Sequence, residues 1–105
     1  MLLDEVDRRA VYVAEGLGHG FVALTDDSAL TYLCSEPYNP DREHTVNALD
    51  PALALPWPTD VELLLSPRDR AAPSLAEAGE AGALPSYDDC QRYYRQLRST
   101  ADAPA

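Results

Sequence analysis

Residues 9–34 read RAVYVAEGLGHGFVALTDDSALTYLC, and this stretch decides the fold expected from the sequence. Three runs rich in β-branched, aromatic and other apolar residues, at 9–13, 21–24 and 29–34, have the composition of strands. A turn with three glycines in residues 14–20 separates the first two runs, and TDDS at 25–28 separates the second from the third. The pattern therefore predicts an antiparallel sheet.

Beyond residue 34 the sequence favours loops first and a helix at the end. Residues 35–42 read SEPYNPDR, and three prolines between 50 and 60 exclude a helix of any length there. The segment 74–85 is rich in Ala, Glu and Gly and is compatible with a helical turn or two. Residues 86–98 predict an amphipathic helix, because Tyr87, Cys90, Tyr94 and Leu97 recur on one face at helical spacing.

Composition narrows the classes of partner. The 105 residues carry eight basic and eighteen acidic side chains, a formal net charge of −10, which opposes binding to a nucleic-acid backbone. No stretch approaches the roughly 20 apolar residues of a membrane span, and the N-terminus lacks the pattern of a signal peptide. Cys34 and Cys90 fit no metal-ligand spacing, so we interpret them as reduced thiols of a cytoplasmic protein.

The turn AEGLGHG at 14–20 resembles the second short motif of the cupins, P-x-G-x-x-H, with Ala14 in place of the proline. In metal-binding cupins the histidine at the position of His19 is a ligand, together with residues of a first motif. That first motif is absent here, and the chain has only one other histidine, His44, which we assign to a local turn. Too few ligands remain for a transition-metal site, so we expect neither a metal nor another cofactor.

A longer series of motifs is more specific. It consists, in order, of His19-Gly20-Phe21, Tyr32, Tyr38-Asn39-Pro40, Arg42-Glu43-His44, Asp50-Pro51, Trp57-Pro58, and Ser66 with Asp69. This series resembles the C-terminal half of the dTDP-4-dehydrorhamnose 3,5-epimerase family. The resemblance implies a mainly β fold, a partial cupin-type jelly roll of antiparallel strands followed by a C-terminal α-helix. Residues 1–73 would be the C-terminal half of the epimerase domain, and 74–105 a helical extension with a frayed tail.

The family reaction is epimerisation at C3 and C5 of a 4-keto-6-deoxy sugar carried on dTDP. Each carbon lies next to the C4 ketone, so the reaction needs a base, an acid across the ring and a donor at the C4 oxygen. By resemblance, Tyr32 matches the acid, and Asp69 matches the aspartate that orients the histidine base. The base itself belongs to the half that is absent here. Residues that resemble substrate-binding positions are His19, Tyr38, Glu43 and Arg68.

Simpler interpretations remain open for these residues. A tyrosine in an apolar strand is usually a packing residue, and an aspartate in a polar turn is usually a cap or solvated. For the chain as a whole, the first hypothesis is an epimerase that is a homodimer in its full-length form and inactive as the isolated 105 residues. The second is a non-catalytic truncated remnant or assembly module of such an enzyme. The third is an unrelated small β-protein. Without partners for its strands, the chain alone is expected to fold poorly or to self-associate.

Overall fold

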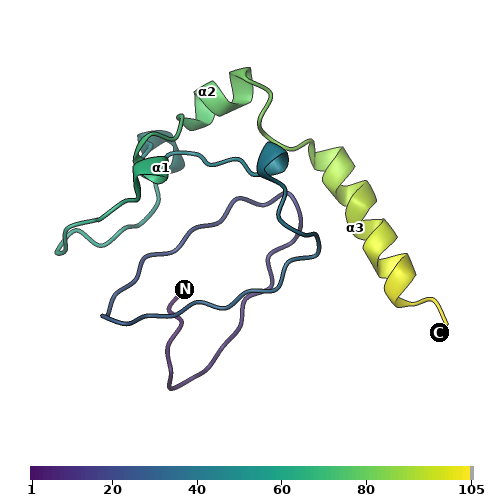
Figure 1. Cartoon of the computed structure of the whole chain (residues 1–105), viewed down its shortest axis with the longest axis horizontal. Helices are drawn as coiled ribbons and strands as arrows, with labels where there is room; N and C mark the ends of the chain where they lie inside the picture. The colour runs from purple at the N-terminus through teal and green to yellow at the C-terminus, as the bar shows by residue number, and fades with distance from the viewer. Residues whose placement is uncertain (105) are drawn as a thin grey trace. The chain divides into compact units, whose positions relative to one another are not determined.

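The computed structural model describes residues 1–104, and helices are its only regular elements within that range. In chain order they are η1 (Pro40–Arg42), η2 (Pro51–Leu53), α1 (Pro67–Arg70), α2 (Leu75–Glu80) and α3 (Tyr87–Ala101) (Figure 1). The helix expected over 86–98 is present as α3, and the helical turns expected in 74–85 are present as α2.

The expected mainly β, partial cupin-type jelly roll is wrong for this chain. Residues 9–13, 21–24 and 29–34 are irregular, and no residue between 1 and 104 is assigned to a strand. The physical reason is the lack of partners, because a strand is defined by backbone hydrogen bonds to a neighbouring strand. Among the described residues, no backbone–backbone hydrogen bond involves residues 9–13, 21–24 or 29–34. Local composition favours extended chain here, but it does not supply a second strand to pair with.

The contacts divide the chain into two compact units. One unit combines Met1–His19 with the described residues from Pro85 onward, and the other is Gly20–Leu84. The boundary between residues 73 and 74 suggested by the sequence stays a prediction.

In the unit Gly20–Leu84, several hydrogen bonds join distant segments within residues 45–84. The backbone N–H of Asn47 donates to the carbonyl of Pro73 at 2.8 Å, which ties a loop to the start of α2. The Asp50 carboxylate accepts the N–H of Leu75 at 2.7 Å and that of Ala52 at 3.0 Å. These two backbone donors, Leu75 foremost, hold the pKa of Asp50 below its usual range.

The short helices α1 and α2 are fixed by their N-terminal caps. The Ser66 hydroxyl accepts the N–H of Asp69 at 3.1 Å, and Pro at the first helical position suits the start of α1. At α2, Ser74 and Glu77 form a reciprocal capping box, and the backbone N–H of Ser74 lowers the pKa of the Glu77 carboxyl. Ala78 of α2, 2% exposed, is the one buried residue among those described. The unit therefore rests on hydrogen bonds and caps, with almost no apolar core.

In the other unit, α3 packs against the glycine turn. The Ser86 hydroxyl accepts the N–H of Asp89 and caps the helix. Gly16 has φ +87°, and a Cβ built there would lie 2.2 Å from Sγ of Cys90. Only glycine allows the turn to approach the helix this closely.

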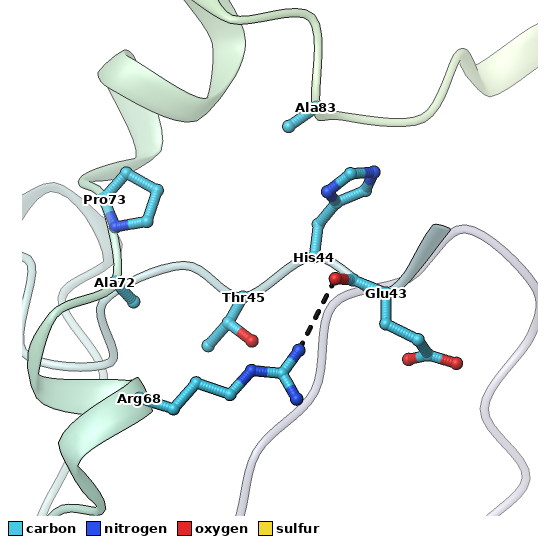
Figure 2. A pocket seen from close by; sticks show the side chains of 7 residues that line it. All are labelled: Glu43, His44, Thr45, Arg68, Ala72, Pro73 and Ala83. Atoms are coloured by element: carbon cyan, nitrogen blue, oxygen red, sulfur yellow. Dashed lines mark hydrogen bonds between the residues drawn. The ribbon is translucent and has the colours of Figure 1, made fainter. Parts of the chain in front are cut away.

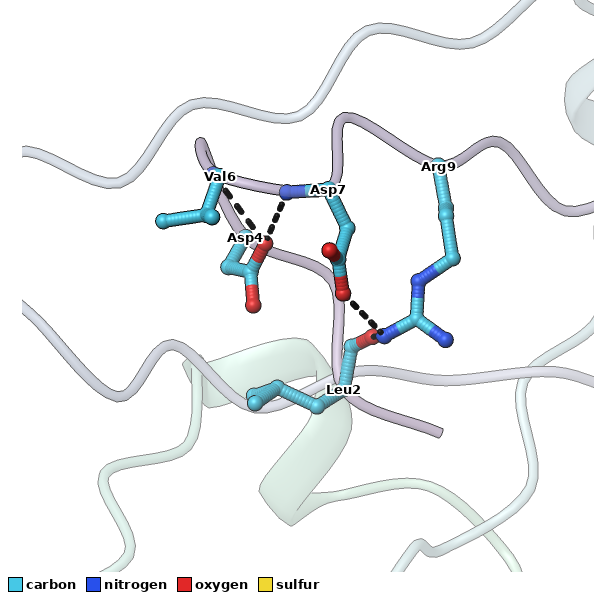
Figure 3. A network of polar contacts seen from close by, with 5 residues as sticks. All are labelled: Leu2, Asp4, Val6, Asp7 and Arg9. Atoms are coloured by element: carbon cyan, nitrogen blue, oxygen red, sulfur yellow. Dashed lines mark hydrogen bonds and ion pairs between the residues drawn. The ribbon is translucent and has the colours of Figure 1, made fainter.

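The first nine residues form a turn of their own in this unit (Figure 3). Oδ1 of Asp4 accepts the backbone N–H groups of Val6 at 3.1 Å and Asp7 at 2.8 Å. Arg9 pairs with Asp7 at 3.4 Å and donates to the carbonyl of Leu2 at 2.8 Å. This segment is thus held by an Asx-type turn and an exposed ion pair, which contribute little to stability.

Candidate functional site

An open pocket of about 260 Å³ lies in the unit Gly20–Leu84 (Figure 2). Its lining comes from the loop after η1, from α1 and from the segments on either side of α2. The residues are Glu43, His44, Thr45, Arg68, Ala72, Pro73 and Ala83.

Local structure places the polar groups of this pocket. Glu43 is the C-terminal cap residue of η1, and Arg68 is carried by the single turn of α1. Nη2 of Arg68 donates to the backbone carbonyl oxygen of Glu43 at 3.5 Å, a long hydrogen bond (Figure 2). The guanidinium has five N–H donors and this bond uses one, so Arg68 retains donors for an anionic or carbonyl group.

Of the residues predicted from the sequence, Glu43 and Arg68 are brought together in this pocket. Asp69 follows Arg68 in α1 and is half-buried, but it does not line the cavity. Tyr32 and Tyr38 belong to the same unit, are both exposed, and lie outside the lining. His19 is exposed and belongs to the other unit.

One lining residue was placed elsewhere by the sequence reasoning. His44, assigned to a local turn, lines the pocket beside Glu43 and Arg68. Its position in the sequence directly after Glu43 could have indicated that it lies at the same site. Its imidazole adds two ring nitrogens that can form hydrogen bonds.

A second cavity, of about 200 Å³, lies in the other unit, between the glycine turn and the start of α3. Glu15 and Cys90 are among its lining residues, and Oε2 of Glu15 is buried without a hydrogen-bond partner. Beside it, Arg98 donates to the Tyr94 hydroxyl at 2.9 Å and thereby lowers the pKa of that phenol.

Neither a cluster of metal ligands nor a membrane-spanning helix is found within residues 1–104. Between residues 1 and 104, no three or more His, Cys, Asp or Glu side chains gather closely enough to hold a metal ion. In the same range, no helix has both the length and the apolar character needed to cross a membrane.

Comparison with known proteins identifies the class. A family model described as dTDP-4-dehydrorhamnose 3,5-epimerase matches residues 1–77. The match covers well over half of the chain, and the chain belongs to this family of dTDP-sugar epimerases. The resemblance noted in the sequence is therefore confirmed.

Individual relatives of this chain are epimerases of the same family. The dTDP-4-dehydrorhamnose 3,5-epimerase of Mycolicibacterium smegmatis is 56% identical over 98 residues, covering 93% of this chain and 48% of that protein. The dTDP-4-dehydrorhamnose 3-epimerase of Streptomyces niveus is 57% identical over 89 residues, covering 85% of this chain and 42% of that protein. The chain thus spans about half the length of the curated relatives it matches.

A solved structure is similar as well. ChmJ, a 3'-monoepimerase from Streptomyces bikiniensis crystallised with dTDP-quinovose, superposes with a TM-score of 0.58 at 52% identity. The superposition covers 63% of this chain and 33% of ChmJ. A double mutant of ChmJ in complex with dTDP, with one histidine changed to asparagine and one tyrosine to phenylalanine, gives a TM-score of 0.54.

Proposed function

We propose that this chain forms part of an enzyme that epimerises a 4-keto-6-deoxy sugar carried on dTDP, in the route to dTDP-L-rhamnose or a related deoxysugar. The observation that carries the proposal is the family match over residues 1–77, together with relatives of 50–57% identity that are all dTDP-sugar epimerases. Isomerisation of this kind needs no cofactor, because the C4 ketone itself acidifies the neighbouring C–H bonds.

In this mechanism a base removes the proton next to the ketone, the enolate forms, and an acid returns a proton to the opposite face. We assign the acid to Tyr32, whose phenol carries an O–H group that can donate a proton. Asp69 orients the histidine base, which comes from outside this chain. The ChmJ double mutant, in which one histidine and one tyrosine are replaced, supports a histidine–tyrosine pair in this family.

Substrate contacts are assigned to His19, Tyr38, Glu43 and Arg68. Support for two of them is their meeting in one pocket, where the Arg68 guanidinium carries unused donors beside Glu43. A phosphate or sugar carbonyl is a suitable ligand for that guanidinium. The enzyme is proposed to act as a homodimer in the cytoplasm, and the two unpaired cysteines fit a reducing compartment.

A chimera tests the proposal directly. The 98 matched residues of the M. smegmatis epimerase are replaced by the corresponding residues of this chain. The chimera is incubated with the dTDP-4-keto-6-deoxy sugar in D₂O, and deuterium at C3 and C5 is measured by NMR. We expect incorporation with the native sequence and a loss of at least 100-fold with Tyr32→Phe, because general acid catalysis contributes about 10²–10⁴ in rate. Tyr87→Phe, an exposed tyrosine outside the family match, is the matched control.

Two results decide against the assignment. Unchanged exchange in Tyr32→Phe removes the acid role from this residue. No exchange in a folded chimera, with the native M. smegmatis enzyme active, favours the second function, an assembly module without catalysis. The exposure of both Tyr32 and Tyr38 in the isolated chain is the observation that favours this alternative.

The position of the deuterium also distinguishes a 3-epimerase, which labels C3 alone, from a 3,5-epimerase, which labels C3 and C5. Relatives of both kinds match this chain equally well.

A further inference from the structure

Residues 43–50 and 68–75 lie side by side in the unit Gly20–Leu84 and run in the same direction. Three hydrogen bonds join them, and in chain order these are Arg68 to the Glu43 carbonyl at 3.5 Å (Figure 2), Asn47 to the Pro73 carbonyl at 2.8 Å, and Leu75 to the Asp50 carboxylate at 2.7 Å. The first and last of these pairs are each 25 residues apart. The three bonds therefore fix one register between the two segments.

The bond at Asp50 is the one that holds this register most firmly. The Arg68 bond is long and exposed, whereas the Leu75 bond is short, part-buried and made to a charged acceptor. The Leu75 N–H is also the chief cause of the lowered pKa of the Asp50 carboxyl, so the carboxylate is ionised at neutral pH. Loss of this carboxylate should therefore loosen residues 68–75 against residues 43–50.

The chain between Asp69 and Leu75 has little conformational freedom. The Ala72 N–H donates to the Asp69 carbonyl at 3.3 Å. The ring of Pro73 restricts its φ, and Ser74 is fixed as the N-terminal cap of α2. A displacement of Leu75 is therefore passed on to α1 and to Asp69.

We propose that Asp50 is a positioning residue for the epimerisation, because by holding Leu75 it keeps Asp69 in register with the segment that carries Glu43. The proposal rests on the proposed function, in which Asp69 orients the histidine base. Asparagine cannot replace Asp50, since its side chain has only one acceptor oxygen. Asparagine is a good helix cap, so that oxygen keeps the bond to Ala52 at the start of η2, and the bond to Leu75 is lost.

The chimera with the M. smegmatis epimerase tests this proposal through the rate of deuterium exchange at saturating substrate. We expect Asp50→Asn to lower kcat roughly 10-fold or more, because a misplacement of about 1 Å can cost about 10²-fold. The double variant Asp50→Asn with Asp69→Asn should be no slower than Asp69→Asn alone, since Asp50 acts through Asp69. Circular dichroism checks that each variant is folded. If Asp50→Asn does not fold, Asp50→Glu takes its place in the cycle, because it keeps both oxygens and moves them by one methylene.

The pH profile of kcat/KM is a second measurement, because its low-pH limb reports the histidine base. An aspartate held beside a histidine raises the pKa of the imidazole, so a loosened Asp69 should move this limb to lower pH in Asp50→Asn. Glu77→Ala is the matched control. It removes the carboxylate of the capping box at α2 and leaves the bond between Asp50 and Leu75 in place, so the limb should not move.

Three results would overturn the positioning role. These are full exchange in a folded Asp50 variant, a loss in the double variant that multiplies the two single losses, and an equal shift of the pH profile in Glu77→Ala. Each of them leaves the proposed function intact, because the native chimera still exchanges. No exchange in the native chimera would refute the proposed function, and the positioning role with it.

Discussion

Replacing Gly16 by alanine should release α3 from the glycine turn. Gly16 has φ +87°, a left-handed conformation that costs a residue with a Cβ about 1–2 kcal/mol. The new Cβ would also lie 2.2 Å from Sγ and 2.9 Å from Cβ of Cys90, so the helix or the thiol must move. We expect a combined cost of about 2 kcal/mol, which raises the population of the open form roughly 30-fold.

The Cys90 thiol reports this opening directly, because it is half-buried against the turn. In a Cys34→Ser background, the reaction of Cys90 with a disulfide reagent is followed at neutral pH. Its rate tracks the open population as long as reclosing is faster than the reaction. We expect the Gly16→Ala variant to react roughly 30-fold faster than its parent.

Gly18→Ala is the matched control, since no atom lies within 4 Å of a Cβ at that position and its φ is not left-handed. It should leave the rate unchanged. Equal rates for the two alanine variants would refute the reasoning, because they would mean that α3 does not rest on the Gly16 turn.

Two further predictions concern hydrogen bonds of Asp50 and Trp57 in the unit Gly20–Leu84. The Asp50 pKa is lowered, chiefly by the N–H of Leu75, so the stabilisation it gives is complete above about pH 4 and is lost as pH falls through the lowered pKa. Circular dichroism from pH 7 to pH 2 should show a loss of helix signal, and this loss should be smaller in Asp50→Asn. The same loss of helix signal at low pH in the variant would contradict this prediction. Trp57→Phe removes the indole bond to the Ala48 carbonyl at 2.7 Å and should lower the free energy of unfolding by about 1 kcal/mol. Urea titration followed by circular dichroism measures the change, and an unshifted midpoint would show that the bond contributes nothing.

The helices α2 and α3 were predictable because their signals are local, whereas the short helices η1, η2 and α1 lie in segments expected to be loops, and the exclusion of any helix between residues 50 and 60 was wrong for η2. For α3, an apolar stripe at helical spacing and a serine three residues before Asp89 lie within one short segment, and Ser86 does cap the helix. The same holds for α2, where Ser74 and Glu77 form the capping box. Such elements need no information from distant residues.

The prediction of a sheet was wrong because strand pairing is not a local property. Residues 21–24 and 29–34 have strand composition, but pairing depends on a partner that sequence periodicity does not specify. The expected site residues were likewise only partly brought together in the structure. Glu43 and Arg68 were named through the family resemblance, as were Tyr32 and Asp69. The structure brings Glu43 and Arg68 together in one pocket across 25 residues of sequence, and it does not place Tyr32 or Asp69 there. The place of His44 in the pocket lining was not expected, because the sequence assigned this residue to a local turn.

Tyr32, the proposed acid, is 74% exposed in the described structure. General acid catalysis requires the donor to lie within hydrogen-bond reach of its acceptor, in a site that holds both in place. The proposed role of Tyr32 therefore depends on the surroundings that the rest of the epimerase provides in the chimera. Loss of deuterium exchange in the Tyr32→Phe chimera, with exchange retained in Tyr87→Phe, would show that those surroundings use this phenol.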